Sequence, residues 1–202
     1  MDRVLPETPD AAPLRERLAH FESCPITGIH LWFDRQIADL DHAVLLDRTV
    51  QWMFHKSRLL VTRAATDSEP GGSYIELVVS ASKSLIDKSR AEIVDLALKE
   101  IREFFPAARE ATLTKSAVIK EVHATYSPRP GIDAFRPPQS TVWPRVFLAG
   151  DWTATGWPAT MEGAVRSGYL AAEGLLHAAG MKDKELLARD LPPSGLMRLF
   201  YR

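Results

Sequence analysis

The stretch that decides the fold is VFLAGDWTATGWPATMEGAVRSGYLAAEGLL, residues Val146 to Leu176. It opens with four apolar residues that stop at Gly150-Asp151, and a loop rich in glycine, proline, threonine and tryptophan follows. A helical pattern rich in small residues then starts at Met161. This order predicts a strand, a Gly-Asp turn and a helix, which together can dock a large anionic cofactor.

The turn and the helix start have the chemistry that such a cofactor needs. Gly150 lets a ligand approach the backbone without a Cβ atom in the way. Asp151 carries an acceptor-only carboxylate, which suits a ribityl or ribose hydroxyl better than a phosphate. Thr160 is predicted to cap the helix, whose first-turn N–H groups and dipole favour negative charge nearby. From the residues alone, an ordinary strand–helix unit with a glycine-rich turn remains the alternative.

Composition bounds the possibilities. The chain has 202 residues, of which 46% are hydrophobic, so it can build one large core or two small ones. Its net charge of −1 and its mixed charges exclude an electrostatic nucleic-acid interface. The single Cys24 excludes an internal disulfide and indicates a reducing compartment, and the six histidines show no metal-ligand spacing. We therefore expect no bound metal and no nucleic-acid partner.

No secretory signal and no run of ~20 apolar residues is visible in the sequence. We expect a cytoplasmic protein. The alternative is peripheral contact with the inner face of the membrane, to which the apolar and basic tail Leu196–Tyr201 would contribute.

The rest of the chain predicts mostly strands with one amphipathic helix. Ser89-Arg90-Ala91-Glu92 has capping-box spacing and is followed by apolar residues at i, i+4 up to Phe105. Residues 49–57 are ambiguous between strand and helix, and residues 59–66 could form a further strand. The fold class expected is α/β of the mixed α+β kind: a mixed sheet carrying a helix, plus the strand–helix unit. The predicted elements are a short helix near 14–21 and strands at 26–34, 42–46, 74–80 and 111–126.

Three segments carry a resemblance to a known family: PITGIHLWFDR at Pro25–Arg35, HATYSPRPG at His123–Gly131, and GDWTATGWPATMEGAVRSG at Gly150–Gly168. They resemble the squalene-associated FAD-dependent desaturases of the amine oxidase and phytoene desaturase superfamily, a group that includes hydroxysqualene dehydroxylase. The resemblance covers about residues 20 to 180 and only the C-terminal half of such flavoproteins. It implies FAD as cofactor and a dinucleotide-binding domain interleaved with a substrate domain.

The resemblance also implies a domain plan and a flavin site. Residues 1–24 are a linker with a short helix, 25–140 belong to the substrate-binding domain, 141–180 are the C-terminal segment of the Rossmann-like FAD-binding domain, and 181–202 are a tail. Helical N–H groups at Met161 would stabilise charge on the reduced flavin. The positions that match flavin-contacting ones are Gly150, Asp151, Trp152, Pro158, Met161, Glu162, Gly163 and Ala164.

The other half of the FAD site is not evident. None of the eleven glycines forms the GxGxxG loop that holds the pyrophosphate in this family. We expect a missing N-terminal FAD-binding half, supplied by the same gene or by a separate chain, and an isolated chain that is inactive.

The substrate side is predicted less directly. Through the resemblance, a hydrophobic substrate tunnel would be lined by His30, Trp32, Gln51, Trp52 and Phe54. The alternative is that these side chains are buried inside a sheet–helix core.

Catalytic groups are harder to assign. His123 and Tyr126 are weak candidates, because a histidine can protonate a departing hydroxyl. A structural, hydrogen-bonded role for His123 is the alternative. Arg166 is expected to be a surface or ion-pairing side chain and not a substrate ligand.

The expected reaction is reductive dehydroxylation of hydroxysqualene to squalene, in squalene and hopanoid biosynthesis. The alternatives are a carotenoid (phytoene-type) desaturase, a flavin amine oxidase fragment, or a non-catalytic remnant acting as an interaction module.

Overall fold

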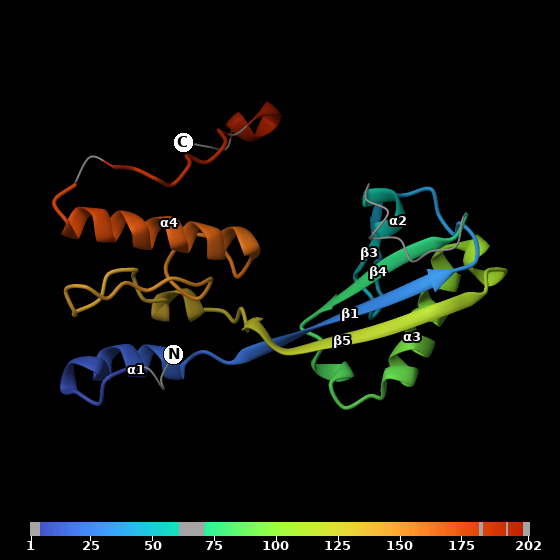
Figure 1. Ribbon diagram of the computed structural model, residues 1–202, viewed down its shortest axis with the longest axis horizontal. Coiled ribbons are helices and arrows are strands. Elements are labelled where there is room, and N and C mark those ends of the chain that lie inside the picture. The colour runs from blue at the N-terminus through green and yellow to red at the C-terminus, as the bar shows by residue number, and fades with distance from the viewer. Residues whose placement is uncertain (1–4, 61–70, 182–183, 193, 200–202) are drawn as a thin grey trace. The chain divides into compact units, whose positions relative to one another are not determined.

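The computed structural model describes residues 5–60, 71–181, 184–192 and 194–199 (Figure 1). The chain divides into two compact units. One unit, the sheet unit, comprises Ser23–Ser127, and the other, the helical unit, comprises Met1–Glu22 with Pro128–Arg202. The mixed α and β fold class is therefore confirmed. The strands of the described residues lie in the sheet unit, and the helices Ala12–Ala19 and Met161–Ala178 lie in the helical unit.

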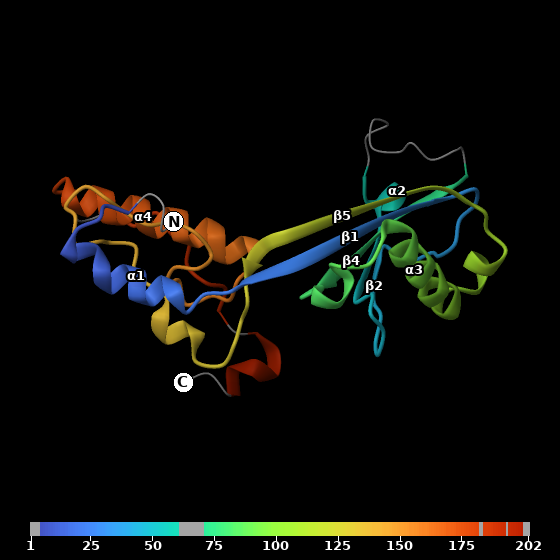
Figure 2. The ribbon, with the colours of Figure 1, turned by 90° about the horizontal axis from the view of Figure 1, so that it is seen from below.

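The sheet unit contains one five-stranded sheet with strand order β2-β3-β4-β1-β5. Every pairing in it is antiparallel, where the sequence had suggested a mixed sheet. Helix α3 lies against one face, as Figure 2 shows, and its apolar residues join the core of the sheet. The elements are β1 (Ser23–Phe33), β2 (His42–Val44), β3 (Trp52–His55), α2 (Lys56–Leu59), β4 (Ser73–Ser80), α3 (Arg90–Phe104) and β5 (Leu113–Tyr126).

Helix α3 forms where its local signals place it. The Ser89 hydroxyl accepts the N–H of Glu92 at 3.2 Å, and the Glu92 carboxylate accepts the N–H of Ser89 at 2.7 Å, which confirms the capping box. Ile93, Ala97 and Ile101 form the fully buried stripe of the helix. The amphipathic pattern thus fixes which side of the helix meets the sheet.

The two faces of the sheet differ sharply. Ile29, Leu31 and Phe33 of β1 point into the α3 core and are almost fully buried. The alternate residues His30 and Trp32 lie on the opposite face, because side chains alternate along a strand. This second face is the one that the predicted substrate residues would occupy.

The helical unit contains α1 (Ala12–Ala19), a short 3-10 helix (Ile132–Phe135) and α4 (Met161–Ala178). Figure 1 shows the irregular chain that precedes α4 between α1 and α4. Helix α4 starts at Met161 as predicted. No helix within the described ranges is long and apolar enough to cross a bilayer.

Two local predictions were wrong. Val146–Ala149 forms no strand and makes only a single bridge, between Phe147 and Ser140, because a ladder needs a neighbouring strand and this segment has one paired residue. Leu59 ends helix α2 instead of starting a strand, and residues 61–66 of that predicted strand lie outside the described residues. The ambiguous segment before it becomes β3 followed by α2.

Candidate functional site

The candidate site is the loop from Gly150 to Pro158, which we call the Gly-Asp loop, together with the start of α4. The Thr160 hydroxyl accepts the N–H of Gly163 at 3.1 Å, so Thr160 is the N-cap as predicted. A Cβ atom on Gly163 would stand 2.5 Å from the carbonyl oxygen of Pro158. The loop therefore lies against the first turn of α4 at a distance that only glycine permits.

Gly150 anchors the other end of the loop. Its φ of 141° is unfavourable for other residues, and a Cβ atom there would come within 2.2 Å of the Trp152 indole nitrogen. Its N–H donates to the hydroxyl of the buried Ser167 at 2.7 Å, and its carbonyl accepts the N–H of Thr153 at 3.0 Å. Ser167 in turn donates to the carbonyl of Ala164 at 2.5 Å. Gly150 is thus fastened to the second turn of α4.

Arg136 ties the middle of the loop together, and sequence reasoning missed it. Its guanidinium donates to the carbonyls of Trp157 (2.6 Å) and Asp151 (2.9 Å) and to the Thr155 hydroxyl (3.1 Å). It also pairs with the Asp133 carboxylate at 3.1 Å, and only 4% of its side chain is exposed. No periodic pattern marks such a residue, because its partners lie 15 to 21 positions further along the chain.

Gln139 adds a second support from the same segment. Its amide donates to the Thr153 hydroxyl at 3.1 Å and to the Ala154 carbonyl at 2.9 Å. The N–H of Ala154 donates to the Pro137 carbonyl at 2.8 Å. Pro137 and Gln139 therefore support the loop as a neighbouring strand would, with two side-chain hydrogen bonds and one main-chain hydrogen bond.

The start of α4 presents main-chain N–H donors and the carboxylate of Glu162, which is paired with Arg166. Met161 and Glu162 are exposed, and their N–H groups belong to the first turn, where no intrahelical acceptor exists. The Glu162 carboxylate is held by Arg166 at 2.9 Å, and this arginine also pairs with Asp190 and lies 4.6 Å from the Trp157 ring. Arg166 is thus ion-paired as expected, although it is buried and not at the surface.

These features fit the flavin end of FAD. They combine the partly buried Asp151, whose carboxylate is an acceptor, with donor groups at a helix start beside the exposed Ala164. They hold no counterpart of the GxGxxG loop for a pyrophosphate. The described residues also contain no group of three His, Cys, Asp or Glu side chains arranged to hold a metal ion.

The open face of the sheet, opposite α3, is rich in aromatic rings, and we call it the aromatic face. The rings of Trp32 and Tyr74 stack at 4.3 Å and 3°, and the His30 Nδ1 atom lies 2.9 Å from the Tyr74 hydroxyl. Trp52 and Phe54 stack at 5.8 Å on the same face, two strands away from Trp32. Burial raises the pKa of Tyr74, so its hydroxyl keeps its proton at neutral pH.

One group on this face has an unmet hydrogen bond. The indole N–H of Trp32 is buried and has no acceptor among the described residues. The Lys115 ammonium lies 4.6 Å from the centre of the same ring. A buried donor without an acceptor is costly, and the indole nitrogen is covered by protein, so a ligand acceptor would reach it only after its surroundings move.

The remaining predicted residues lie elsewhere. Gln51 is not on the aromatic face: its side-chain amide bonds the main chain of Ser80 at 3.0 Å and 3.5 Å, and it lies beside Glu100 near α3. His123 and Tyr126 belong to β5 in the sheet unit. The exposed His123 hydrogen-bonds the Ser23 hydroxyl at 2.7 Å, which matches the structural alternative for that residue.

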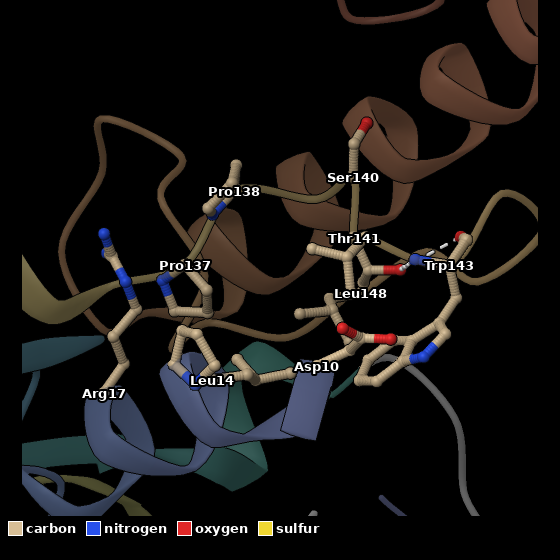
Figure 3. Close-up of a pocket in the computed structure, with 11 residues that line it drawn as sticks. Asp10, Leu14, Arg17, Pro137, Pro138, Ser140, Thr141, Trp143 and Leu148 are labelled. Atoms are coloured by element: carbon tan, nitrogen blue, oxygen red, sulfur yellow. Dashed lines mark hydrogen bonds between the residues drawn. The ribbon is translucent and has the colours of Figure 1, made fainter. Parts of the chain in front are cut away.

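A pocket of about 230 Å³ lies between α1 and the chain at 137–148 (Figure 3). In Figure 3, Leu14 and Arg17 of α1 face Pro137, Leu148 and the Trp143 ring. The volume is below the range of about 300–1,000 Å³ that ligand pockets usually have. None of the predicted site residues lines it, so we do not assign the substrate there.

Comparison with known proteins gives a consistent family match. Residues 3–176 match the family model of flavin containing amine oxidoreductases. The 15-cis-phytoene desaturase of Synechococcus elongatus is 32% identical over 201 residues, which cover 95% of this chain and 40% of that protein. A probable zeta-carotene desaturase of the same organism is 30% identical, over 88% of this chain and 40% of that protein. The chain thus spans about 40% of the length of these curated relatives.

Solved structures share the fold. Reduced UDP-galactopyranose mutase aligns with a TM-score of 0.58 at 12% identity, over 84% of this chain and 36% of that one. A putative protoporphyrinogen oxidase from Exiguobacterium sp. 255-15 aligns with a TM-score of 0.55 at 12% identity, over the same shares. At this identity the likeness concerns the fold alone.

Proposed function

Because the chain belongs to the family of flavin containing amine oxidoreductases, we propose that it is the flavin- and substrate-contacting part of an FAD-dependent oxidoreductase of isoprenoids. The observation that carries the proposal is the Gly-Asp loop, locked onto the capped start of α4. This arrangement offers main-chain donors and an acceptor carboxylate to one ligand edge.

The chain's own residues would bind and orient the flavin. The first-turn N–H groups of α4 stabilise negative charge, and Asp151 accepts a hydrogen bond from a ribityl hydroxyl. Gly150 and Gly163 let the Trp152 ring and the Pro158 carbonyl pack against the backbone, which would shape the loop around the flavin. FAD, when bound, supplies the two-electron chemistry at a carbon of the substrate. The pyrophosphate would be held by an N-terminal half, encoded in the same gene or in a separate chain.

The aromatic face would line the substrate site. Its two stacked ring pairs lie on either side of the Lys56–Glu76 ion pair and offer apolar surface that would orient a long hydrocarbon chain without requiring hydrogen bonds. Such a surface also keeps water from the reacting carbon. Trp32, Trp52 and Phe54 are the side chains that we assign to this role, with His30 at its polar edge.

For the substrate, we favour a carotenoid precursor and hence a phytoene-type desaturase. This reading is supported by the names of the relatives, which are phytoene and zeta-carotene desaturases. A water-insoluble substrate of this kind also fits peripheral contact of the protein with a membrane surface.

A second candidate is the reductive dehydroxylation of hydroxysqualene. The observation in its favour is the buried indole N–H of Trp32, which lacks an acceptor among the described residues. An allylic hydroxyl oxygen would provide that acceptor, and a plain hydrocarbon would not. His30 and Tyr74, which are hydrogen-bonded to each other next to Trp32, offer further polar atoms.

The test combines flavin binding with a choice of substrates. The chain is expressed alone and together with the N-terminal part of the Synechococcus elongatus 15-cis-phytoene desaturase, and flavin absorbance is recorded for each preparation. The flavin-loaded pair is then supplied with phytoene or simple amines together with an electron acceptor, and with hydroxysqualene after its flavin has been reduced. Conversion of phytoene supports the favoured substrate, and conversion of hydroxysqualene alone supports the second. A folded pair that never takes up flavin would leave the interaction-module alternative in place of the enzyme.

Trp32→Phe separates the two substrates further. It keeps an aromatic ring for stacking on Tyr74 and removes the indole N–H together with part of the ring system. The smaller ring should affect both substrates alike, so turnover of the hydrocarbon measures the lost packing, and turnover of hydroxysqualene is expected to fall about tenfold further, since one hydrogen bond to the substrate is lost. Equal effects on both substrates would contradict a role of this donor in recognition.

A further inference from the structure

We infer that Arg136 is a positioning residue for the flavin: it holds the Gly-Asp loop in its binding shape and places a buried positive charge beneath that loop. The inference rests on the proposed function for its flavin part. Its structural part concerns the apo chain and stands on the contacts of Arg136 alone.

Arg136 positions the loop through the loop atoms that accept its hydrogen bonds. Arg136 reaches three loop residues, Asp151, Thr155 and Trp157, with separations of 2.6 to 3.1 Å. The stretch from Asp151 to Thr160 contains no helix or strand, so no ladder of main-chain bonds fixes it. A planar guanidinium can serve several acceptors at fixed angles, which an ammonium cannot. Arg136 therefore takes the place of a neighbouring strand for this part of the chain.

Arg166 is the second buried arginine among the described residues of the helical unit, and its surroundings differ from those of Arg136. Arg166 pairs with two carboxylates, those of Glu162 and Asp190. Arg136 pairs with Asp133, whose side chain is 81% exposed and therefore strongly screened by water. The guanidinium, with 4% of its side chain exposed, is a buried positive charge in direct contact with the loop residues Asp151, Thr155 and Trp157.

The positive charge of Arg136 would act on a flavin held by this loop. Reduction adds negative charge to the flavin, and a fixed positive charge nearby favours the reduced form. Arg136 is thus expected to raise the midpoint potential of the bound flavin. Replacing Arg136 by lysine keeps the charge and loses the planar guanidinium with its several donors, whereas replacing it by methionine loses both.

The experiment measures loop order and potential separately. Hydrogen exchange of peptides covering residues 150–160 is recorded for the apo chain, and the midpoint potential is recorded for the flavin-loaded pair described above. The variants are Arg136→Lys, Arg136→Met and Thr155→Val, which removes one acceptor and leaves the arginine in place. Arg129→Met is the matched control, since Arg129 is a half-exposed arginine of the same unit that pairs with Glu22 at 2.9 Å.

Both Arg136 variants are expected to lose about tenfold or more in loop protection, because hydrogen bonds from a charged donor to the loop are lost in each. Thr155→Val should lose less, and Arg129→Met should match the wild type. Arg136→Met should give a lower midpoint potential than Arg136→Lys. Protection of the α4 peptides at 165–178 reports whether the unit still folds.

The outcomes distinguish the two levels of the argument. If the loop of Arg136→Met exchanges as slowly as that of Arg129→Met, the positioning role is refuted. If the lysine and methionine variants share one midpoint potential, the charge role is refuted. If the wild type takes up no flavin while Arg136→Met still loses loop protection, the proposed function fails and the positioning role stands.

Discussion

The close approach between the Gly-Asp loop and α4 can be tested by adding one methyl group. Gly163 and Gly168 are both helical residues of α4, and both lack a side chain. An added Cβ atom at Gly163 would stand 2.5 Å from the main-chain oxygen of Pro158, whereas at Gly168 it would meet no atom within 4 Å. The substitutions Gly163→Ala and Gly168→Ala therefore differ mainly in one steric contact.

The expected energies follow from this difference. Replacing glycine by alanine within a helix stabilises it by about 0.5–1 kcal/mol, so Gly168→Ala should stabilise the helical unit by that amount. At Gly163 the same gain, or a smaller one in the first turn, is opposed by an overpacking cost of about 1–3 kcal/mol. The backbone of Pro158 cannot swing away as a flexible side chain would. The two variants should therefore differ in stability by about 1–3 kcal/mol, with Gly163→Ala the less stable.

Hydrogen exchange of α4 peptides is the appropriate assay. A single unfolding midpoint would mix the two units of the chain, whereas exchange at residues 163–178 reports the helical unit alone. Gly163→Ala should also weaken flavin uptake by the co-expressed pair, because the added methyl group forces the Gly-Asp loop away from α4. If Gly163→Ala protects α4 as well as Gly168→Ala does, the contact with Pro158 does not constrain the loop and the reasoning is wrong.

Three further outcomes are expected. Ser89→Ala should lower the free energy of unfolding of the sheet unit by about 0.5–2 kcal/mol, measured by hydrogen exchange of α3 peptides, because α3 loses its capping box. Ser167→Ala should cost about 1–3 kcal/mol in the helical unit, seen as faster exchange near Gly150, because the N–H of Gly150 loses its acceptor. Burial lowers the pKa of His55 below its usual 6.5, so the unfolded imidazole takes up a proton that the folded one resists. The free energy of unfolding of the sheet unit should therefore hold above pH 6.5 and fall as the pH decreases below it. If the protection of β1 and β4 peptides, corrected for the intrinsic exchange rate, has the same pH dependence in His55→Gln, this expectation is contradicted.

The elements that the sequence predicted well are those with local signals. The alternation in β1, the capping box of α3 and the N-cap of α4 each involve residues within four positions of one another. Such signals act before any tertiary contact forms, so the printed sequence contains them completely. The start of α4 at Met161, on which the candidate site depends, is of this kind.

The features that escaped prediction depend on distant partners. Val146–Ala149 has the composition of a buried strand, but a strand exists only when another strand pairs with it, and one bridge to Ser140 is not a ladder. Gln51 precedes β3 by one position, and the strand alternation turns it away from Trp52. Arg136 lies in an irregular segment with no periodicity, so nothing local shows that its side chain is buried.

The two surfaces of the proposed site are therefore built by different means, and they should respond differently to mutation. The aromatic face is fixed by the main-chain register of a sheet whose opposite side is a closed core, so replacing one ring leaves the others in place. The Gly-Asp loop is fixed by side chains that reach its main chain, chiefly those of Arg136, Gln139 and Ser167. Losing one of these frees several loop residues at once, because no ladder remains to hold them. Change in substrate preference is consequently easier to obtain on the aromatic face, whereas the loop tolerates little variation without loss of the flavin.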